Sequence, residues 1–362
     1  MIAAVLNLFG WHVDLGAYWF GTTIKALVVL VAVPTSTALI VQTFLFKMMA
    51  HMQSRLGPME AGPHGSLQLV GDGLKFIQKE LITPDGADRK VFTLAPIVVL
   101  FSTFMLVIVI PLGPSLIAED FDTGIFFALA VSSLSVLGVL MAGWASANKF
   151  SLIGGLRAAG QLIAYELPLL LAVVGVVMQA GTASLQGIVH AQKGFEVFGR
   201  NLGGVPFVIP QFIGFVLFLI AAQAELAQPP FDMPVAESEL VAGYQTEYSG
   251  LLFLFFYIGE FGSAFALSAI AATLFLGGWY VPTEAWALVH FFKVGAESGV
   301  WANFLGFGVL FVKTMFVAFL IFWFRFTYPR FREDQLQTFA WKYLIPISLV
   351  NIAGTMILKV IF

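Results

Sequence analysis

Eight long stretches of this chain contain few or no acidic and basic residues, and that pattern limits the fold more than any other feature. A helix that crosses a bilayer needs about 20 predominantly apolar residues. Spans are predicted near residues 23–46, 92–113, 123–143, 154–179, 206–223, 250–277, 303–324 and 342–361. Only 11% of residues are charged, against about 25% in a soluble domain. We therefore predict an all-α polytopic membrane protein whose residues 1–362 form one transmembrane domain.

The basic residues between the predicted spans indicate the orientation of the chain. Eight spans place both termini on one side, and the loops after the odd-numbered spans on the other. Those loops hold twelve Lys and Arg residues, against five on the side of the termini, with Lys313 inside a span. Because cytoplasmic loops are enriched in Lys and Arg, we predict that both termini are extracytoplasmic.

Residues 66–82 form an amphipathic pattern between the first two spans. The apolar residues of this segment are spaced 3-4-3-4, as on one face of a helix: Leu67, Val70, Leu74, Ile77 and Leu81. Such a helix lies in the membrane interface. The pattern alone favours a plain interfacial anchor, and the sharper alternative is a wall of a site entered from the membrane.

The fourth span contains a charged pair that cannot meet on a straight helix. Glu166 follows Arg157 by nine residues, which is about 180° around the axis. Ionisable residues inside spans are functional by default, so Glu166 is a candidate proton site. The alternative is a structural carboxyl satisfied by another helix.

Residues 224–249 form an acidic segment on the predicted cytoplasmic side. Between residues 225 and 247 there is no Lys or Arg, and the five acids are Glu225, Asp232, Glu237, Glu239 and Glu247. Three prolines prevent one long helix, and the apolar stretch at 239–244 does not suit a free loop. Irregular backbone at membrane depth must be buried in protein or line water, so we predict that this segment packs within the bundle.

Clustered carboxyls in such a place titrate as a coupled set, which suits a proton relay. A cation site and a docking face for a basic partner are the alternatives.

Glu260, in the sixth span, extends the series. Its neighbours include small residues at 3-4-3-4 spacing, which let another helix approach closely, so Glu260 should face protein or a cavity. Lys313 is the candidate partner for its charge.

The remaining composition excludes several classes of site. The chain has no cysteine and therefore no disulfide and no cysteine-ligated cluster. Its five histidines lie near or outside the span ends, which argues against haem. We predict no metal site, no cofactor bound covalently or by metal ligation and, at a net charge of −3, no nucleic-acid partner. Any electron carriers must lie in other subunits.

Several segments resemble the H subunit of bacterial NADH–quinone oxidoreductase, the family of mitochondrial NADH dehydrogenase subunit 1. They are MQSRLGP at 52–58, GPHGSLQLVGDGLKFIQKE at 62–80, ADRKVFTLAP at 87–96, LRAAGQLIAYELPL at 156–169, PFDMPVAESELVAGYQTEYSG at 230–250 and TLFLGGW at 273–279. The resemblance implies a membrane subunit of respiratory complex I that is not catalytic alone. Its partners would be other membrane subunits and peripheral iron–sulfur subunits, and its substrate a quinone such as ubiquinone or menaquinone.

The resemblance also implies roles for individual residues. A proton relay would comprise Glu166, Glu225, Asp232, Glu237, Glu239, Glu247 and Glu260. The wall or entrance of a quinone tunnel would include Arg55, Asp72, Lys75 and Arg157. The chain departs from the common pattern at Leu45, Phe46, Gln228 and Val235. Gln228 stands where an Arg is common, just before the PFD motif.

Two other functions remain open at the level of sequence. The membrane subunit of an energy-converting hydrogenase would use the same carboxyls for ion translocation without a quinone. A secondary transporter would work alone, but such proteins often carry internal repeats and interrupted helices in matching halves, and this chain has neither.

Overall fold

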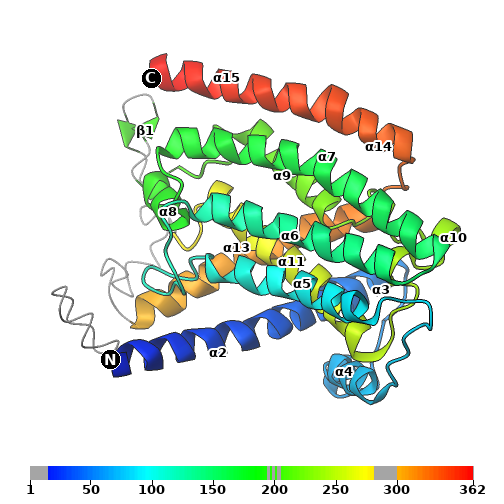
Figure 1. The fold of residues 1–362 in the computed structure, drawn as a ribbon. Helices are drawn as coiled ribbons and strands as arrows, with labels where there is room; N and C mark the ends of the chain where they lie inside the picture. Colours follow the sequence, from blue (N-terminus) through cyan, green and yellow to red (C-terminus); the bar gives the residue numbers. More distant parts are fainter. Residues whose placement is uncertain (1–14, 194–195, 198–199, 202–204, 281–299, 362) are drawn as a thin grey trace, which may run out of the picture.

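A computed structural model describes residues 15–193, 196–197, 200–201, 205–280 and 300–361. Its long helices lie side by side and cross the view of Figure 1 in roughly one direction. They are α2 (Leu15–Ile40), α5 (Arg89–Ile108), α6 (Gly124–Ala145), α7 (Lys149–Ala180), α11 (Gly250–Phe275), α13 (Val300–Thr327) and α15 (Ile345–Ile361). This arrangement confirms the predicted all-helical membrane bundle.

Shorter elements connect the long helices. They are η1 (Val41–Met48), α3 (Met49–Met52), η2 (Pro63–Gly65), α4 (Gln68–Gln78), α8 (Leu185–Lys193), α9 (Phe212–Glu225), α10 (Glu237–Leu240), η3 (Gly243–Gln245), α14 (Glu333–Phe339) and η5 (Ala340–Leu344). One antiparallel pair of two-residue strands, β1 (Glu196–Val197) and β2 (Arg200–Asn201), follows α8. The segments η1 and η5 are π-helical, a form that is frequent at functional sites.

Seven helices of the described residues are long and apolar enough to cross a membrane. The remaining one, the fifth predicted span at residues 206–223, corresponds to α9, which starts only at Phe212 and has 14 residues. Because a crossing needs about 20 residues, α9 is short for spanning a bilayer alone. The first and last spans are longer than predicted, because the helical conformation continues from α2 to Met52 and begins at Glu333 before α15.

Small residues set the closest helix contacts. Gly143 of α6 and Gly155 of α7 face each other, and a Cβ on either would lie 3.0 Å from the Cα of the other. On α11, a Cβ added to Gly259 would lie 2.7 Å from Val99 of α5. The small residues of α11 therefore pack closely against α5, as their spacing predicted. Glu260 follows Gly259 at this contact.

The start of α2 and the end of α15 lie at the same end of the bundle (Figure 1). This agrees with an even number of crossings, whereas the membrane side of the termini remains a prediction. The opposite end carries α3, α4, α10 and α14.

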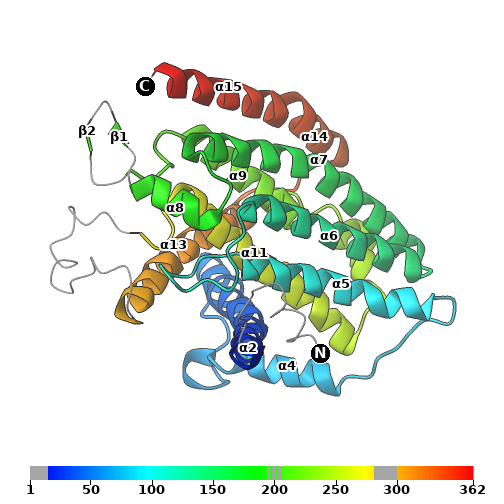
Figure 2. The ribbon, with the colours of Figure 1, turned by 60° about the vertical axis from the view of Figure 1, so that its left-hand side comes forward.

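Helix α4 lies across the bundle, since it is seen end-on in Figure 1 and along its length in Figure 2. It is shorter than the predicted 66–82, because Lys79 adopts an extended backbone. Phe76 stacks on Phe253 of α11, with ring centroids 5.6 Å apart. The predicted apolar stripe points away from the protein, with its five side chains 51–63% exposed. The helix thus has a protein-facing side and a separate apolar side suited to lipid.

The acidic segment is packed, as predicted from its apolar content. Phe231, Met233 and Tyr244 are buried. Gly243 has a φ of +55°, and a side chain there would collide with the carbonyl of Pro234. The segment therefore folds back on itself at a position that only glycine fits.

Candidate functional site

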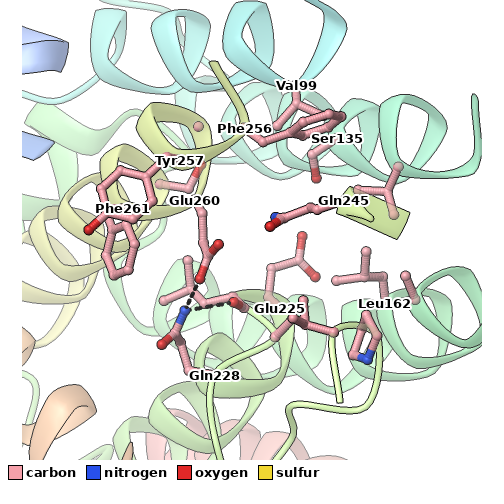
Figure 3. A pocket seen from close by; sticks show the side chains of 18 of the residues that line it. Val99, Ser135, Leu162, Glu225, Gln228, Gln245, Phe256, Tyr257, Glu260 and Phe261 are labelled. Carbon is pink, nitrogen blue, oxygen red and sulfur yellow. Dashed lines mark hydrogen bonds between the residues drawn. The ribbon is translucent and has the colours of Figure 1, made fainter. Parts of the chain in front are cut away.

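Three of the predicted carboxyls line one cavity of about 270 Å³, and two of them, Glu225 and Glu260, are labelled in Figure 3. Glu225 ends α9, Asp232 lies in the acidic segment and Glu260 lies within α11. Other lining residues come from η1, α5, α6, α7 and α13: Leu45, Val99, Ser102, Leu106, Ser132, Ser135, Val139, Ala158, Leu162 and Arg325. The fold thus brings together carboxyls that are 35 positions apart in the sequence, because α9 and α11 both pack on this space.

Glu260 has a direct polar partner in the acidic segment. Nε2 of Gln228 donates to Oε1 of Glu260 at 2.5 Å (Figure 3). Oε1 of Gln228 in turn accepts from Nη1 of Arg325 on α13. The guanidinium of Arg325 lies 5.7–5.9 Å from three phenylalanine rings, those of Phe261, Phe322 and Phe326. Cations are attracted to the faces of aromatic rings at such distances.

Arg325, and not Lys313, therefore supplies the positive charge near Glu260. The prediction of a Lys313–Glu260 partnership was wrong. Nζ of Lys313 donates instead to the carbonyls of Gly278, at 2.8 Å, and Tyr280, at 2.7 Å. These carbonyls lie in the turn that follows the end of α11. The lysine thus satisfies backbone acceptors of that turn.

Glu225 projects into the cavity from the end of α9 (Figure 3). In the described part of the chain, its buried Oε2 has no hydrogen-bond partner. Ser132 and Ser135 of α6 line the same part of the cavity, and the charge of Glu166 acts on Glu225. A buried carboxylate oxygen without a donor is costly, so this position calls for a proton or a bound water.

Two buried tyrosines of the acidic segment support the cavity wall. Tyr244 lines the cavity, and burial raises the pKa of its phenol, with the charge of Glu260 adding to the effect. Tyr248 stacks on Phe92 at 4.1 Å and donates to the carbonyl of Phe92 at 3.1 Å. Burial raises the pKa of Tyr248 as well. Both phenols thus keep their protons at neutral pH.

Three of the other predicted carboxyls, those of Glu166, Glu239 and Glu247, lie outside the lining of this cavity. Glu239 is exposed, with Oε2 2.7 Å from Nη1 of Arg157. Glu247 accepts from Nδ2 of Asn148 at 2.5 Å. Glu166 lies on α7, close enough to interact with Glu225. The side chain of Glu237 lies outside the described residues.

The four predicted quinone-site residues are spread over the end of the bundle that carries α4. Arg55 is exposed and donates to Oε1 of Gln53 at 2.9 Å. Lys75 is exposed on α4, and Asp72 of the same helix accepts from Gln68. The charge of Asp72 acts on Tyr257, which lines the cavity. Arg157 borders a separate surface hollow of about 530 Å³ with Glu239, Arg330 and Glu333.

Sequence reasoning missed Gln228 and Arg325 as partners of Glu260. Arg325 was counted as a loop charge, although it is flanked by phenylalanines in FWFRF at 322–326. An arginine at the end of an apolar run with aromatic neighbours is typical of a partly buried cation. That signal could have indicated an interior role. Gln228 carried no signal beyond its departure from the family pattern.

The fold and the cavity define a class: a multi-pass helical membrane protein with a cavity lined by several ionisable side chains. Among the described residues, no group of three or more His, Asp or Glu side chains is placed to hold a metal ion. Comparison with known sequences then narrows the class to a family.

A family model described as NADH dehydrogenase matches residues 24–356. Among similar proteins, the H subunit of NADH-quinone oxidoreductase from Bacteroides thetaiotaomicron is 40% identical over 344 residues, covering 95% of this chain and 90% of that protein. The H subunit from Brevibacillus brevis is 42% identical over 345 residues, covering 93% and 92%. That from Bacteroides fragilis is 43% identical over 317 residues, covering 87% and 84%. The chain belongs to the NADH dehydrogenase family, and the resemblance found in its motifs is confirmed.

Proposed function

We propose that this chain is a membrane subunit of a proton-translocating NADH–quinone oxidoreductase in a bacterial inner membrane. Family membership and the names of its relatives support this proposal. The chain itself has no cysteine, so the iron–sulfur carriers belong to peripheral partner subunits. This chain contributes to quinone binding and to coupling, and it does no chemistry alone.

The cavity that Glu225, Asp232 and Glu260 share is the observation that carries the coupling role. Carboxylates in a low-dielectric space repel one another, so they cannot all be ionised. Protonating one of them changes the proton affinity of the others, because interacting sites titrate as a set. Quinone reduction consumes protons and changes the charge at one end of the set. This change can pass from one carboxyl to the next as a rearrangement of protons, without a large backbone movement.

The remaining relay residues would extend this set in two directions. Glu166 would continue it through its interaction with Glu225. Glu237, Glu239 and Glu247 would continue it along the acidic segment. In this arrangement the pair of Glu239 with Arg157 lies at the outer end, at the surface hollow.

Quinone would approach from the end of the bundle that carries α4. The exposed apolar stripe of α4 suits contact with lipid. Phe76 on its other side stacks on Phe253, which lines the cavity. Arg55, Asp72, Lys75 and Arg157 would border the tunnel at this end. Both termini would then lie outside, as the distribution of Lys and Arg predicts.

The test uses the whole complex, purified and reconstituted into vesicles. Glu→Gln keeps the shape and hydrogen bonding of the side chain and removes its titration. Glu166→Gln, Glu225→Gln and Glu237→Gln should each lower proton pumping, with quinone reduction falling alongside if coupling is tight. Glu119→Gln, on the exposed pair with Lys25, is the control and should leave both unchanged. Wild-type pumping in all three variants would reject the relay.

The composition of the purified complex tests the quinone role separately. We expect bound quinone and co-purifying subunits of NADH dehydrogenase type. Hydrogenase-type partners and no quinone would favour the membrane subunit of an energy-converting hydrogenase instead. Activity of the isolated chain as a transporter would reject both subunit roles.

A further inference from the structure

Gln228 connects three separate parts of the bundle through one side-chain amide. It is buried, with 1% of its surface exposed, and it follows the turn that ends α9. Its Oε1 accepts from Arg325 of α13, and its Nε2 donates to Glu260 of α11. The amide therefore stands between a cation and a carboxylate that lie 65 positions apart in the sequence.

The chemistry of the three groups determines how the amide is oriented. A guanidinium only donates hydrogen bonds, and an ionised carboxylate only accepts them. The amide oxygen must therefore face Arg325, and the amide nitrogen must face Glu260. A primary amide offers both functions on one neutral, planar group. An arginine at position 228 could not accept from Arg325, and an ionised carboxylate there could not donate to Glu260.

The charges on the two sides of the amide balance. Arg325 carries one positive charge and ionised Glu260 one negative charge, and the charge of Arg325 acts on Glu260. The rings of Phe261, Phe322 and Phe326 surround the guanidinium, which limits its freedom to follow Glu260 if the amide is lost. Both Gln228 and Arg325 line the cavity, so a change in this group alters the space that Glu225 and Asp232 share.

We propose that Gln228 is a positioning residue for Glu260: its amide holds the carboxylate toward the cavity and links its negative charge to the guanidinium of Arg325. This inference rests on the proposed function, because it assigns Gln228 a part in proton transfer at Glu260. It gives a distinct role to a position at which this chain departs from the common family residue.

The decisive experiment is a double-mutant cycle in the reconstituted complex. The variants are Gln228→Met, Glu260→Gln and the two together, and the measured quantities are the rate of proton pumping per assembled complex and the number of protons translocated per electron. A lost hydrogen bond to a charged group corresponds to roughly a tenfold change in an equilibrium constant, so Gln228→Met should lower the pumping rate about tenfold. Because Gln228 acts through Glu260, the double variant should pump no worse than Glu260→Gln alone.

Gln179→Met is the matched control, since Gln179 lies in α7 and does not line the cavity. A structural role for Gln228 would reduce the amount of assembled complex without changing the pumping rate per assembled complex. A wild-type pumping rate per assembled complex in Gln228→Met, or effects that multiply in the double variant, would overturn the inference.

A second variant covers the case in which Gln228→Met prevents assembly. Gln228→Glu has nearly the same shape and still accepts from Arg325, but it cannot donate to Glu260 when ionised. It should also lower the pumping rate per assembled complex, and wild-type pumping in this variant would equally overturn the inference. If Glu260→Gln itself pumps like the wild type, the relay at Glu260 fails, whatever Gln228→Met shows.

Discussion

Nη1 of Arg157 lies 2.7 Å from Oε2 of Glu239, so the first half of α7 is tied directly to the acidic segment. Nε of the same guanidinium lies 3.6 Å from Oε2 of Glu333, at the start of α14. One arginine thus joins three parts of the chain at the end of the bundle that carries α4. This arrangement places Glu239 at a surface hollow, away from the cavity that holds Glu225 and Glu260.

The Arg157–Glu239 pair predicts a pH dependence in the acidic segment. The hydrogen bond from Arg157 lowers the pKa of Glu239 below its usual value of 4.5. A carboxyl with a lowered pKa in the folded state stabilises above its unfolded pKa, and that contribution is lost as pH falls through the folded one. The contact should therefore be complete above pH 4.5 and weaken below it.

Hydrogen exchange of residues 237–240, corrected for intrinsic rates, measures this effect in the intact complex. Protection should fall at low pH in the wild type and be lower but insensitive to pH in Glu239→Gln. Glu119→Gln should behave like the wild type. An identical pH profile with and without the Glu239 carboxyl would show that the pair does not hold this segment.

The packing of the acidic segment on α7 predicts that Gly154 cannot accept a side chain. A Cβ at Gly154 would lie 2.7 Å from Cα of Gly243 and from N of Tyr244. Backbone atoms cannot yield as a flexible side chain would, so Gly154→Ala should destabilise by about 1–3 kcal/mol. Gly160 lies on the same helix with its nearest atom at 3.8 Å. Thermal unfolding of the complex should show a loss for Gly154→Ala and none for Gly160→Ala, and equal stability of the two would contradict this packing.

The exposed apolar stripe of α4 predicts a lipid contact. Leu74 and Ile77 are 55% and 63% exposed, and a lysine at either position would put a charge where we expect acyl chains. Leu74→Lys and Ile77→Lys should lower activity with long-tailed quinones or impair assembly. Gln68→Lys, on the opposite and polar face of the same helix with Asp72 and Lys75, is the control. Normal activity with long-tailed quinones in both stripe variants would argue against a membrane-facing role.

The contacts of Lys313 predict a role in stability and not in pumping. Lys313→Met would leave the carbonyls of Gly278 and Tyr280 without this donor. An unsatisfied buried carbonyl costs about 1–3 kcal/mol, so the complex should unfold at a lower temperature. Protons per electron should stay unchanged in the complex that does assemble. A lowered stoichiometry at wild-type stability would restore Lys313 as a participant in the relay.

Much of the fold was predictable because membrane helices follow from local composition. A run of apolar residues must form a helix in lipid, where every backbone group needs a partner. The packed state of the acidic segment followed from its apolar content and prolines, and Glu260 was placed toward protein by its small neighbours. The short length of α9 was not predictable. The backbone forms a turn before the helix, in which Gln211 N donates to the carbonyl of Phe207, but the apolar run at 201–224 contains no residue that indicates this turn.

By itself, the sequence determined the membrane class and the family motifs. These properties depend on residue type and on spacing along one helix, and both can be read locally. Only the tertiary structure decided that Glu225, Asp232 and Glu260 share a cavity, that Glu239 pairs with Arg157, and that Arg325 reaches Glu260 through Gln228. The physical reason is that a side chain's partner depends on how helices far apart in the sequence cross and rotate against each other. Lys313 and Arg325 are both cations on α13, twelve positions apart. The packing of α11 against that helix brings Arg325, and not Lys313, close to Glu260.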